Sequence, residues 1–517
     1  MKVSSLWFLS ALFLLVSVVA SAQEQSERPN LLLTGEFYPK ADSSAGFSTM
    51  ERLGFLEDSK NLDLHMVLEA NNDKQFGSDT VFLRNTNNIG NYFLVDQGYL
   101  RLKGLGLQFQ AGRFLPVDEV DSPYSLVLNS QVNSPNPESM AQYGMTLKYS
   151  LGPFTYSSEW IQLNYRSDFG SLAAAPPAWA AVGSTGFPDR GTDIHNFVFH
   201  SGDWRFGFQD QSIYSQRNYD PEYFFSPVPQ YFTQYLRNIQ GRPWTTGGTD
   251  KYMMGLFGEW NQTDRDAYVQ LQMADFNLHF LNANIFPNNP GKFAWSFGGH
   301  IINDWGRWGL FHAGATKFMY EPLTMGTGDQ AVRDFGNFYY PDTVYSMNGG
   351  FVPINLQANQ IGYTNGENNL AFMATWEQPY LEDRLKLKAS LEFLLAGNNS
   401  PANPWQDTNG QNEMGTQILS DPNLEKSIKT NIHGAYLEGP WTFSVDLTMG
   451  EIFNVLQLQD PSNTDPSWSA VDRLVQIWKA SDKNQAIFTL ILGVKYVFDA
   501  TPMLDEMARQ NTQALSD

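Results

Sequence analysis

The sequence predicts an all-β fold: a transmembrane antiparallel β-barrel of about 18 strands, with 16 as the alternative count, and long extracellular loops partly folded into the lumen. Three observations predict it. Apolar and polar residues alternate along many segments, short turns recur along the whole chain, and the first 22 residues have the form of a secretory signal peptide.

The N-terminus contains the parts of a cleaved signal peptide. Lys2 precedes an apolar stretch from residue 6 to residue 20, and Ala20, Ser21 and Ala22 form an A-x-A cleavage site. A transmembrane anchor is the alternative, but about 15 apolar residues are fewer than the roughly 20 that a helical span needs. No later segment approaches 18 consecutive apolar residues. We therefore expect residues 1–22 to be removed on export.

Strict alternation predicts strands with one apolar and one polar face. All odd positions from 385 to 395 are apolar, whereas Arg384, Lys386, Lys388, Ser390 and Glu392 occupy the even positions. The same pattern recurs in segments 62–68, 143–151 and 441–449. Because successive strand side chains point to opposite faces, the apolar face must be covered. An apolar face repeated around a closed sheet is stable in water only if lipid covers it.

The spacing of turns gives the strand count. Eight short turns lie near residues 58, 104, 152, 202, 263, 305, 381 and 439. Each interval holds two strands of about ten residues and one long loop, which is typical of outer-membrane barrels. Eight turns imply nine hairpins and therefore 18 strands. The last strand carries LGVKYVF, which looks like a barrel-assembly signal on a closing strand. We assign residues 23–499 to the barrel and 500–517 to a periplasmic C-terminal tail.

Composition narrows the function classes and partners. The net charge of −21 disfavours nucleic acid as a partner, and the absence of cysteine excludes disulfides and thiolate metal sites. Common hydrolase, dinucleotide and phosphate-binding motifs are missing, so we predict no enzyme, no catalytic residues, no cofactor and no metal. The expected location is the outer membrane of a double-membrane bacterium. Expected partners are outer-membrane lipid and the barrel-assembly machinery during biogenesis.

The predicted lumen face carries charges of both signs. The basic residues are Arg101, Lys103, Lys148, Arg205, Lys386, Lys388 and Lys429, and the acidic ones are Asp63, Glu69, Glu159 and Glu259. A ladder of structural ion pairs is the favoured interpretation, and a conducting role is the alternative. A barrel of 18 strands has room for an aqueous channel, although long loops could fill it.

The stretch GRFLPVDEVDSPYSLVLNSQ, residues 112–131, breaks the alternation that precedes it. Arg113 ends a predicted strand, and the acids Asp118, Glu119 and Asp121 precede an apolar Leu-Val-Leu run at 126–128. Because that run would not be stable at the cell surface, we predict a loop folded into the lumen. Arg113 could pair with one of the three acids by charge-assisted hydrogen bonds. A constriction and a loop merely braced on the barrel wall are both open.

Two other loops are rich in aromatic residues, 219–244 and 334–351. Tyrosine and tryptophan rings suit either the core of a folded loop or stacking against the faces of sugar rings. The candidate glycan-stacking residues are Tyr223, Phe224, Tyr231, Tyr235, Trp244, Phe338, Tyr339, Tyr340 and Tyr345.

One segment carries a resemblance to a known family. Gly112-Arg113, SLVLNS at 125–130, NSPNPE at 133–138 and LKYSLGPFTYSSEW at 147–160 together resemble the capsule-assembly Wzi family of outer-membrane proteins. The resemblance implies an 18-stranded barrel, closed by its own loops, that binds or organises capsular or surface polysaccharide without catalysis. A passive porin for small solutes is the alternative function.

Overall fold

The computed structural model describes residues 30–42, 46–71, 92–129, 141–164, 190–215, 217–234, 250–274, 290–321, 337, 343–345, 351–353, 360–399, 416–458 and 478–499. The predicted signal peptide (1–22) and the predicted tail (500–517) lie outside these residues. Within the described ranges, no helix combines the length and the apolar character that crossing a membrane requires.

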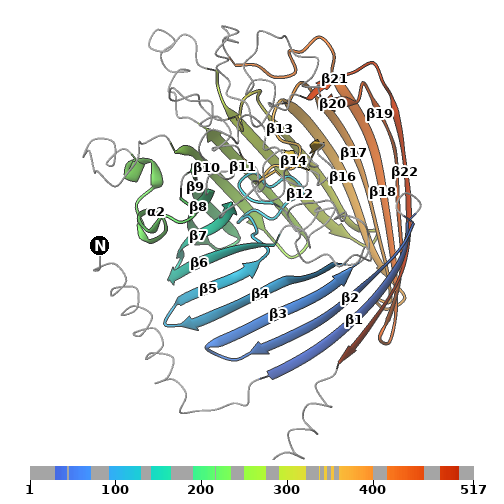
Figure 1. Cartoon of the computed structure of the whole chain (residues 1–517), viewed down its shortest axis with the longest axis horizontal. Coiled ribbons are helices and arrows are strands. Elements are labelled where there is room, and N and C mark those ends of the chain that lie inside the picture. The colour runs from blue at the N-terminus through green and yellow to red at the C-terminus, as the bar shows by residue number, and fades with distance from the viewer. Residues whose placement is uncertain are drawn as a thin grey trace, which may run out of the picture.

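Eighteen strands form one antiparallel sheet, as the sequence predicted. They are β1 (Asn30–Asp42), β2 (Gly46–Asp58), β3 (Leu62–Asn71), β4 (Tyr92–Gly104), β5 (Leu107–Phe114), β6 (Gln142–Leu151), β7 (Phe154–Asn164), β8 (Arg190–Ser201), β9 (Trp204–Ser215), β10 (Lys251–Asn261), β11 (Arg265–Ala274), β12 (Phe293–Asn303), β13 (Gly306–Ala315), β16 (Asn369–Tyr380), β17 (Leu385–Ala396), β18 (Glu425–Glu438), β19 (Trp441–Phe453) and β22 (Gln485–Asp499). Figure 1 shows them as one inclined sheet that curves round on itself.

The last strand closes the sheet into a barrel. β22 pairs with β19 on one side and with β1 on the other, where Phe37 lies opposite Tyr496 and Lys40 opposite Gly493. All eight predicted short turns are confirmed, because each joins neighbouring strands at the end that holds both barrel termini. In two of them Gly152 and Gly439 have φ of 57°, a backbone conformation that favours glycine.

Shorter elements lie between the barrel strands. They are the helix α2 (Pro221–Phe225) and the two-stranded ribbons β14 (Thr343–Tyr345) with β15 (Phe351–Pro353) and β20 (Leu456–Leu458) with β21 (Trp478–Ala480). These elements belong to the loops at the end of the barrel opposite the short turns. In outer-membrane barrels the short turns are periplasmic and the long loops extracellular, so this is the extracellular end.

The two faces of the barrel differ as the alternation predicted. Leu391 and Phe393 of β17, Phe443 and Val445 of β19 and Phe488 of β22 are large apolar residues between 42 % and 63 % exposed. They share the outer face, and a closed ring of such strands is an outer-membrane β-barrel.

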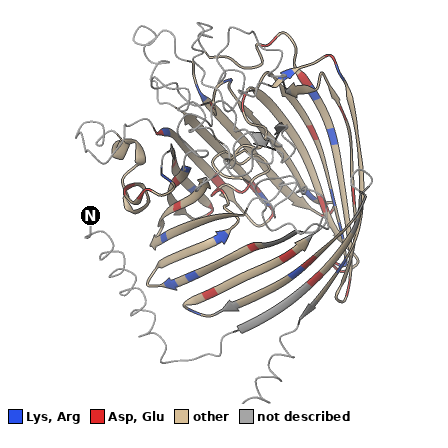
Figure 2. Ribbon diagram, in the orientation of Figure 1, with Lys and Arg blue, Asp and Glu red and all other residues tan. Residues whose placement is uncertain are grey.

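The inner face carries cross-strand ion pairs, which confirms the predicted ladder. Asp63 lies 2.6 Å from Lys103 Nζ and 3.4 Å from Arg101 Nη1, each on the neighbouring strand β4. Lys388 and Glu377 pair at 3.2 Å between β17 and β16. Figure 2 shows the charges of both signs distributed along these strands. The ladder joins side chains on adjacent strands.

Candidate functional site in the barrel lumen

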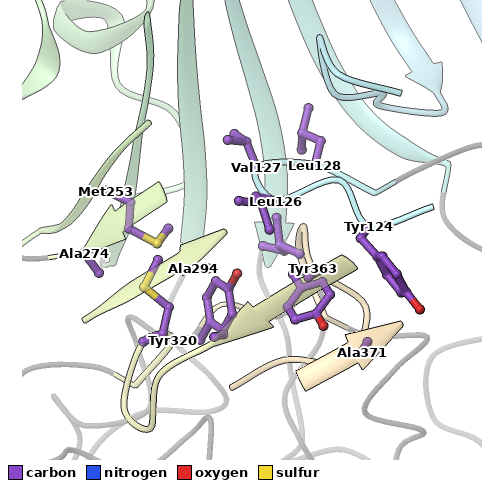
Figure 3. Packing of buried hydrophobic residues seen from close by; sticks show 14 of the residues in the cluster. Tyr124, Leu126, Val127, Leu128, Met253, Ala274, Ala294, Tyr320, Tyr363 and Ala371 are labelled. Atoms are coloured by element: carbon purple, nitrogen blue, oxygen red, sulfur yellow. The ribbon is translucent and has the colours of Figure 1, made fainter. Parts of the chain in front are cut away.

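A loop that follows β5 lies inside the barrel and contributes to its buried core. In this inner loop, residues 115–129, the side chains of Leu126, Val127 and Leu128 are 0 %, 2 % and 2 % exposed. They belong to one apolar cluster with Ile194 and Met253, which face inward from β8 and β10. Figure 3 shows the three residues pointing among the strands of the barrel wall. The predicted infolding is therefore confirmed.

Asp118 anchors the inner loop to the wall. Its carboxylate accepts hydrogen bonds from the amides of Val127 (2.8 Å) and Leu128 (3.2 Å) within the loop. It also accepts from Nε2 of Gln209 on β9 (2.9 Å) and Nε2 of Gln270 on β11 (3.0 Å). Burial raises the pKa of Asp118, and these hydrogen bonds counteract part of that rise. One carboxylate thus holds both the turn of the loop and its attachment to two strands.

A second attachment lies nearly halfway round the ring from β5, where the loop begins. The hydroxyl of Tyr124 donates to Glu392 Oε1 of β17 at 2.8 Å. Leu126 N donates to Gln270 Oε1 at 3.0 Å, and Asn129 Nδ2 donates to the carbonyl of Gln360 at 2.9 Å. Because β5 and β17 lie on opposite sides of the ring, the inner loop crosses the lumen. It is braced on the wall at both ends of that crossing.

Other loop segments pack against the inner loop. Met319 and Tyr320 follow β13, Ile361 and Tyr363 precede β16, and all four are fully buried in the same cluster. The rings of Tyr124 and Tyr363 meet edge to face at 5.9 Å. The lumen between β7 and β17 is therefore filled by chain at this level.

The remaining wall is open to water. On β16 to β19, the lumen-facing side chains of Lys388, Glu377, His433 and Asp446 are 54 %, 39 %, 39 % and 37 % exposed. By contrast, lumen-facing Gln270 of β11 is fully buried. The inner loop thus covers one part of the inner wall and leaves another part solvated.

One arginine joins the inner loop to the charged wall below it. Arg205 of β9 donates to the carboxylate of Glu119 in the loop and to that of Glu259 on β10. Glu159 of β7 is also buried on this side of the lumen. Arg205 therefore compensates a local excess of negative charge.

Replacing Arg205 with alanine should make the lumen more attractive to cations, because Glu119 and Glu259 lose their counter-charge. We expect the reversal potential in a KCl gradient to shift towards the value for K⁺. Arg384→Ala is the matched control, because Arg384 lies 53 % exposed in the β16–β17 turn and pairs with Glu438 there. An unchanged reversal potential in the Arg205 variant would place these carboxylates outside the ion path.

Arg113 of β5 and Asp121 of the inner loop differ from Asp118 in their surroundings. Arg113 Nε donates to the carbonyl of Asp96 at 3.0 Å, and its guanidinium lies over the ring of Tyr143. The prediction that it pairs with Asp118, Glu119 or Asp121 is wrong, because strand alternation turns Arg113 to the opposite face from Gln110 and Phe114. Asp121 is exposed, unlike Asp118.

The predicted glycan-stacking residues are only partly described. Tyr223 and Phe224 are fully buried, so neither ring has a face open to a sugar, and they pack on the outer wall of the barrel. Tyr231 is 44 % exposed. Tyr235, Trp244, Phe338, Tyr339 and Tyr340 and the side chain of Tyr345 lie outside the described residues.

Comparisons with known proteins give likeness of fold. No family model and no curated protein matches the chain. Among solved structures, the outer membrane protein OprD from Pseudomonas aeruginosa is 9% identical, with 91% of this chain and 93% of that chain covered and a TM-score of 0.42. The outer membrane protein opdK from the same organism is 9% identical, with 92% and 99% covered and a TM-score of 0.43. Acinetobacter baumannii OccAB4 is 9% identical, with 92% and 100% covered and a TM-score of 0.44. Likeness at these identities carries no argument about function, and none of these comparisons supports the resemblance to the Wzi family.

Proposed function

We propose that this protein is an outer-membrane channel through which small hydrophilic solutes diffuse, and that it has no catalytic activity. The observation that carries the proposal is the division of the lumen by the inner loop. That loop crosses from β5 to β17 and buries the wall towards the extracellular end, while polar wall residues on β16 to β19 remain exposed nearer the short turns.

The physical argument starts from barrel size. A closed sheet of 18 strands is too wide for its own inward side chains to fill, so either water or loops occupy the lumen. Here the inner loop occupies part of it, and paired charges such as Lys388 with Glu377 line the solvated part. Because these paired charges are exposed, they stay hydrated and keep the passage wet. The inner loop then sets the width of the passage.

Polysaccharide binding has less support from the described residues. Of the proposed aromatic set, Tyr223 and Phe224 are buried, and the exposed Tyr231 belongs to the segment on the outer wall. Surface glycan recognition stays a prediction that rests on loop residues outside the described ranges.

Liposome swelling with uncharged sugars of increasing size tests the proposal. We expect vesicles containing the full-length protein to take up small sugars quickly and larger ones progressively more slowly, because the inner loop limits the width. Vesicles prepared identically without protein provide the baseline. Uptake at the baseline rate for even the smallest sugar would contradict a diffusion channel.

A further inference from the structure

The segment from residue 217 to residue 234, here called the outer-wall loop, lies on the outside of the barrel. Its helix α2 contacts β7 and β8, and Figure 1 shows it beside those strands, away from the lumen. Side chains on β8 and β9 show which face of the wall the loop covers. Gln209 bonds to Asp118 of the inner loop and to Asn196, so both face the lumen. Their neighbours in the chain, Asp210 and His195, therefore face outward.

The outer-wall loop covers polar residues that would otherwise face lipid. Ser158, Asp193, His195, Asp210 and Ser212 project outward from β7, β8 and β9, and each is at most 1 % exposed. Polar groups on the outer face of a barrel are costly in hydrocarbon, and here protein takes the place of lipid.

The wall beneath the loop donates to the loop's backbone carbonyls. Ser158 Oγ donates to the carbonyl of Phe224 at 2.7 Å, and His195 Nε2 lies 2.7 Å from that of Tyr223. Tyr156 and Trp160 donate to the carbonyls of Ser226 (3.1 Å) and Asn218 (2.6 Å). The loop thus reaches about halfway down the strands, because Ser158 and His195 lie near the middle of β7 and β8.

Several backbone N–H groups of the loop also have partners. Asp220 Oδ1 accepts from Glu222 N, Asp210 Oδ2 accepts from Gln230 N at 2.7 Å, and Ser226 Oγ accepts from Val228 N. Three positions of the loop, 221, 227 and 229, are proline and have no N–H to satisfy. Irregular backbone is tolerated at membrane depth only where its polar groups are satisfied, and these bonds and prolines meet part of that requirement.

The surface of the loop that faces away from the barrel is apolar. Phe225, Val228, Tyr231 and Phe232 are 53 %, 42 %, 44 % and 54 % exposed. The rings of Tyr231 and Phe232 meet edge to face at 5.7 Å, and the Tyr231 ring packs on that of Tyr252 at 5.6 Å. The loop therefore turns Phe225, Tyr231 and Phe232 outward, while its bonded backbone carbonyls face the wall.

The outward apolar stripe of the barrel is too short at this place. On β17 it extends from residue 385 to 395, about 28 Å along the membrane normal at the usual rise and tilt. On β9 it comprises Trp204, Phe206 and Phe208, which by the same rise and tilt span only about 11 Å along the membrane normal, and Asp210 follows. The apolar band of such barrels is about 25 Å tall. The exposed rings of the outer-wall loop lie above the short stripe and restore its height.

We propose that the outer-wall loop is a lipid-facing layer, whose exposed rings contact the acyl chains of the outer leaflet over β7 to β10. A second copy of the chain is the competing occupant. The four exposed side chains offer roughly 400 Å², about half of what one partner contributes to a standard interface. Lipid needs no such area, because it covers the rest of the outer face in the same way.

Spin labels on single cysteines test this inference, since the native chain has no cysteine. Phe225→Cys and Phe232→Cys would be labelled in the full-length protein and reconstituted in phosphatidylcholine and phosphatidylglycerol vesicles. Leu310→Cys on the bare wall of β13 is the lipid reference, and Lys60→Cys in the β2–β3 turn is the water reference. Collision rates with oxygen and with a water-soluble nickel chelate give the surroundings of each label.

The expected result is a high oxygen rate and a low nickel rate at both loop positions, matching Leu310→Cys. A nickel rate as high as at Lys60→Cys would place the loop in water and overturn the proposal. Low rates for both reagents, with dipolar broadening between labels, would show a contact between copies of the chain and would also overturn it. None of these outcomes depends on whether the lumen conducts.

Discussion

Replacing Asp118 with alanine is expected to release the inner loop and raise single-channel conductance severalfold. The change leaves the amides of Val127 and Leu128 and the side chains of Gln209 and Gln270 without their common acceptor. Each buried donor left unpaired costs about 1–3 kcal/mol, so the crossing would lose its attachment to β9 and keep those at Gln270, Glu392, Gln360 and Arg205. The wider passage would be measured as larger current steps in planar bilayers.

Asp121→Ala is the matched control, because Asp121 belongs to the same loop but is exposed. We expect it to conduct like the unmodified protein. Proteolysis provides a second readout: chymotrypsin should cut at Tyr124 in the Asp118 variant and leave it intact in the control, since Tyr124 is only 1 % exposed. A folded Asp118 variant with unchanged conductance and unchanged cleavage would contradict the anchoring role of this carboxylate.

Replacing Gly362 with alanine should also displace the inner loop. Gly362 has φ of 82°, and a Cβ at this position would lie 2.1 Å from the carbonyl oxygen of Leu126. Neither backbone can yield without separating the two segments that pack together in the lumen. We expect larger conductance steps than those of the unmodified protein.

Gly366→Ala separates the contact from the backbone cost. Gly366 also has a positive φ, 67°, but the nearest atom to its Cβ would be 3.3 Å away, at the end of the Asn399 side chain. Both variants place a non-glycine residue at positive φ, which costs about 1–2 kcal/mol of folding free energy. Only Gly362→Ala adds the clash with the carbonyl oxygen of Leu126. Equal conductance in the two variants would show that the contact with Leu126 does not hold the loop in place.

The sequence predicted the barrel well because its signals are local. Alternation in segments such as 385–395 and the eight short turns depend on neighbouring residues, and both survive in the structure unchanged. The infolding of the inner loop was also predictable, because three consecutive apolar residues at 126–128 need cover. Its partners were not predictable, since Gln209, Gln270 and Glu392 lie far along the chain and resemble any other inward polar residue.

The position of the aromatic segment around residue 223 could not be predicted from the sequence either. A loop rich in tyrosine and phenylalanine can fold into the lumen, project from the cell or lie against the outer wall. The signal that distinguishes these cases was present but weak: Asp193, His195 and Asp210 fall on the face of β8 and β9 that should be apolar. An interrupted apolar stripe beside a long aromatic loop indicates that the loop covers the strands from outside.

For Arg113, by contrast, the sequence suggested a contact that the structure does not contain. Its place at the start of an acidic loop suggested an ion pair, but a strand extends to Phe114 and alternation fixes the direction of each side chain. In a β-barrel, the alternation of side chains along a strand decides which residues can meet, even when charged residues are close in sequence.

The central claim is that the lumen conducts despite the loop that crosses it. Single-channel recording of the purified full-length protein in a planar lipid bilayer tests it most directly. The account predicts stable current steps that scale linearly with voltage and grow when Asp118 is replaced. Insertion of folded protein without any current steps, both before and after that replacement, would contradict it.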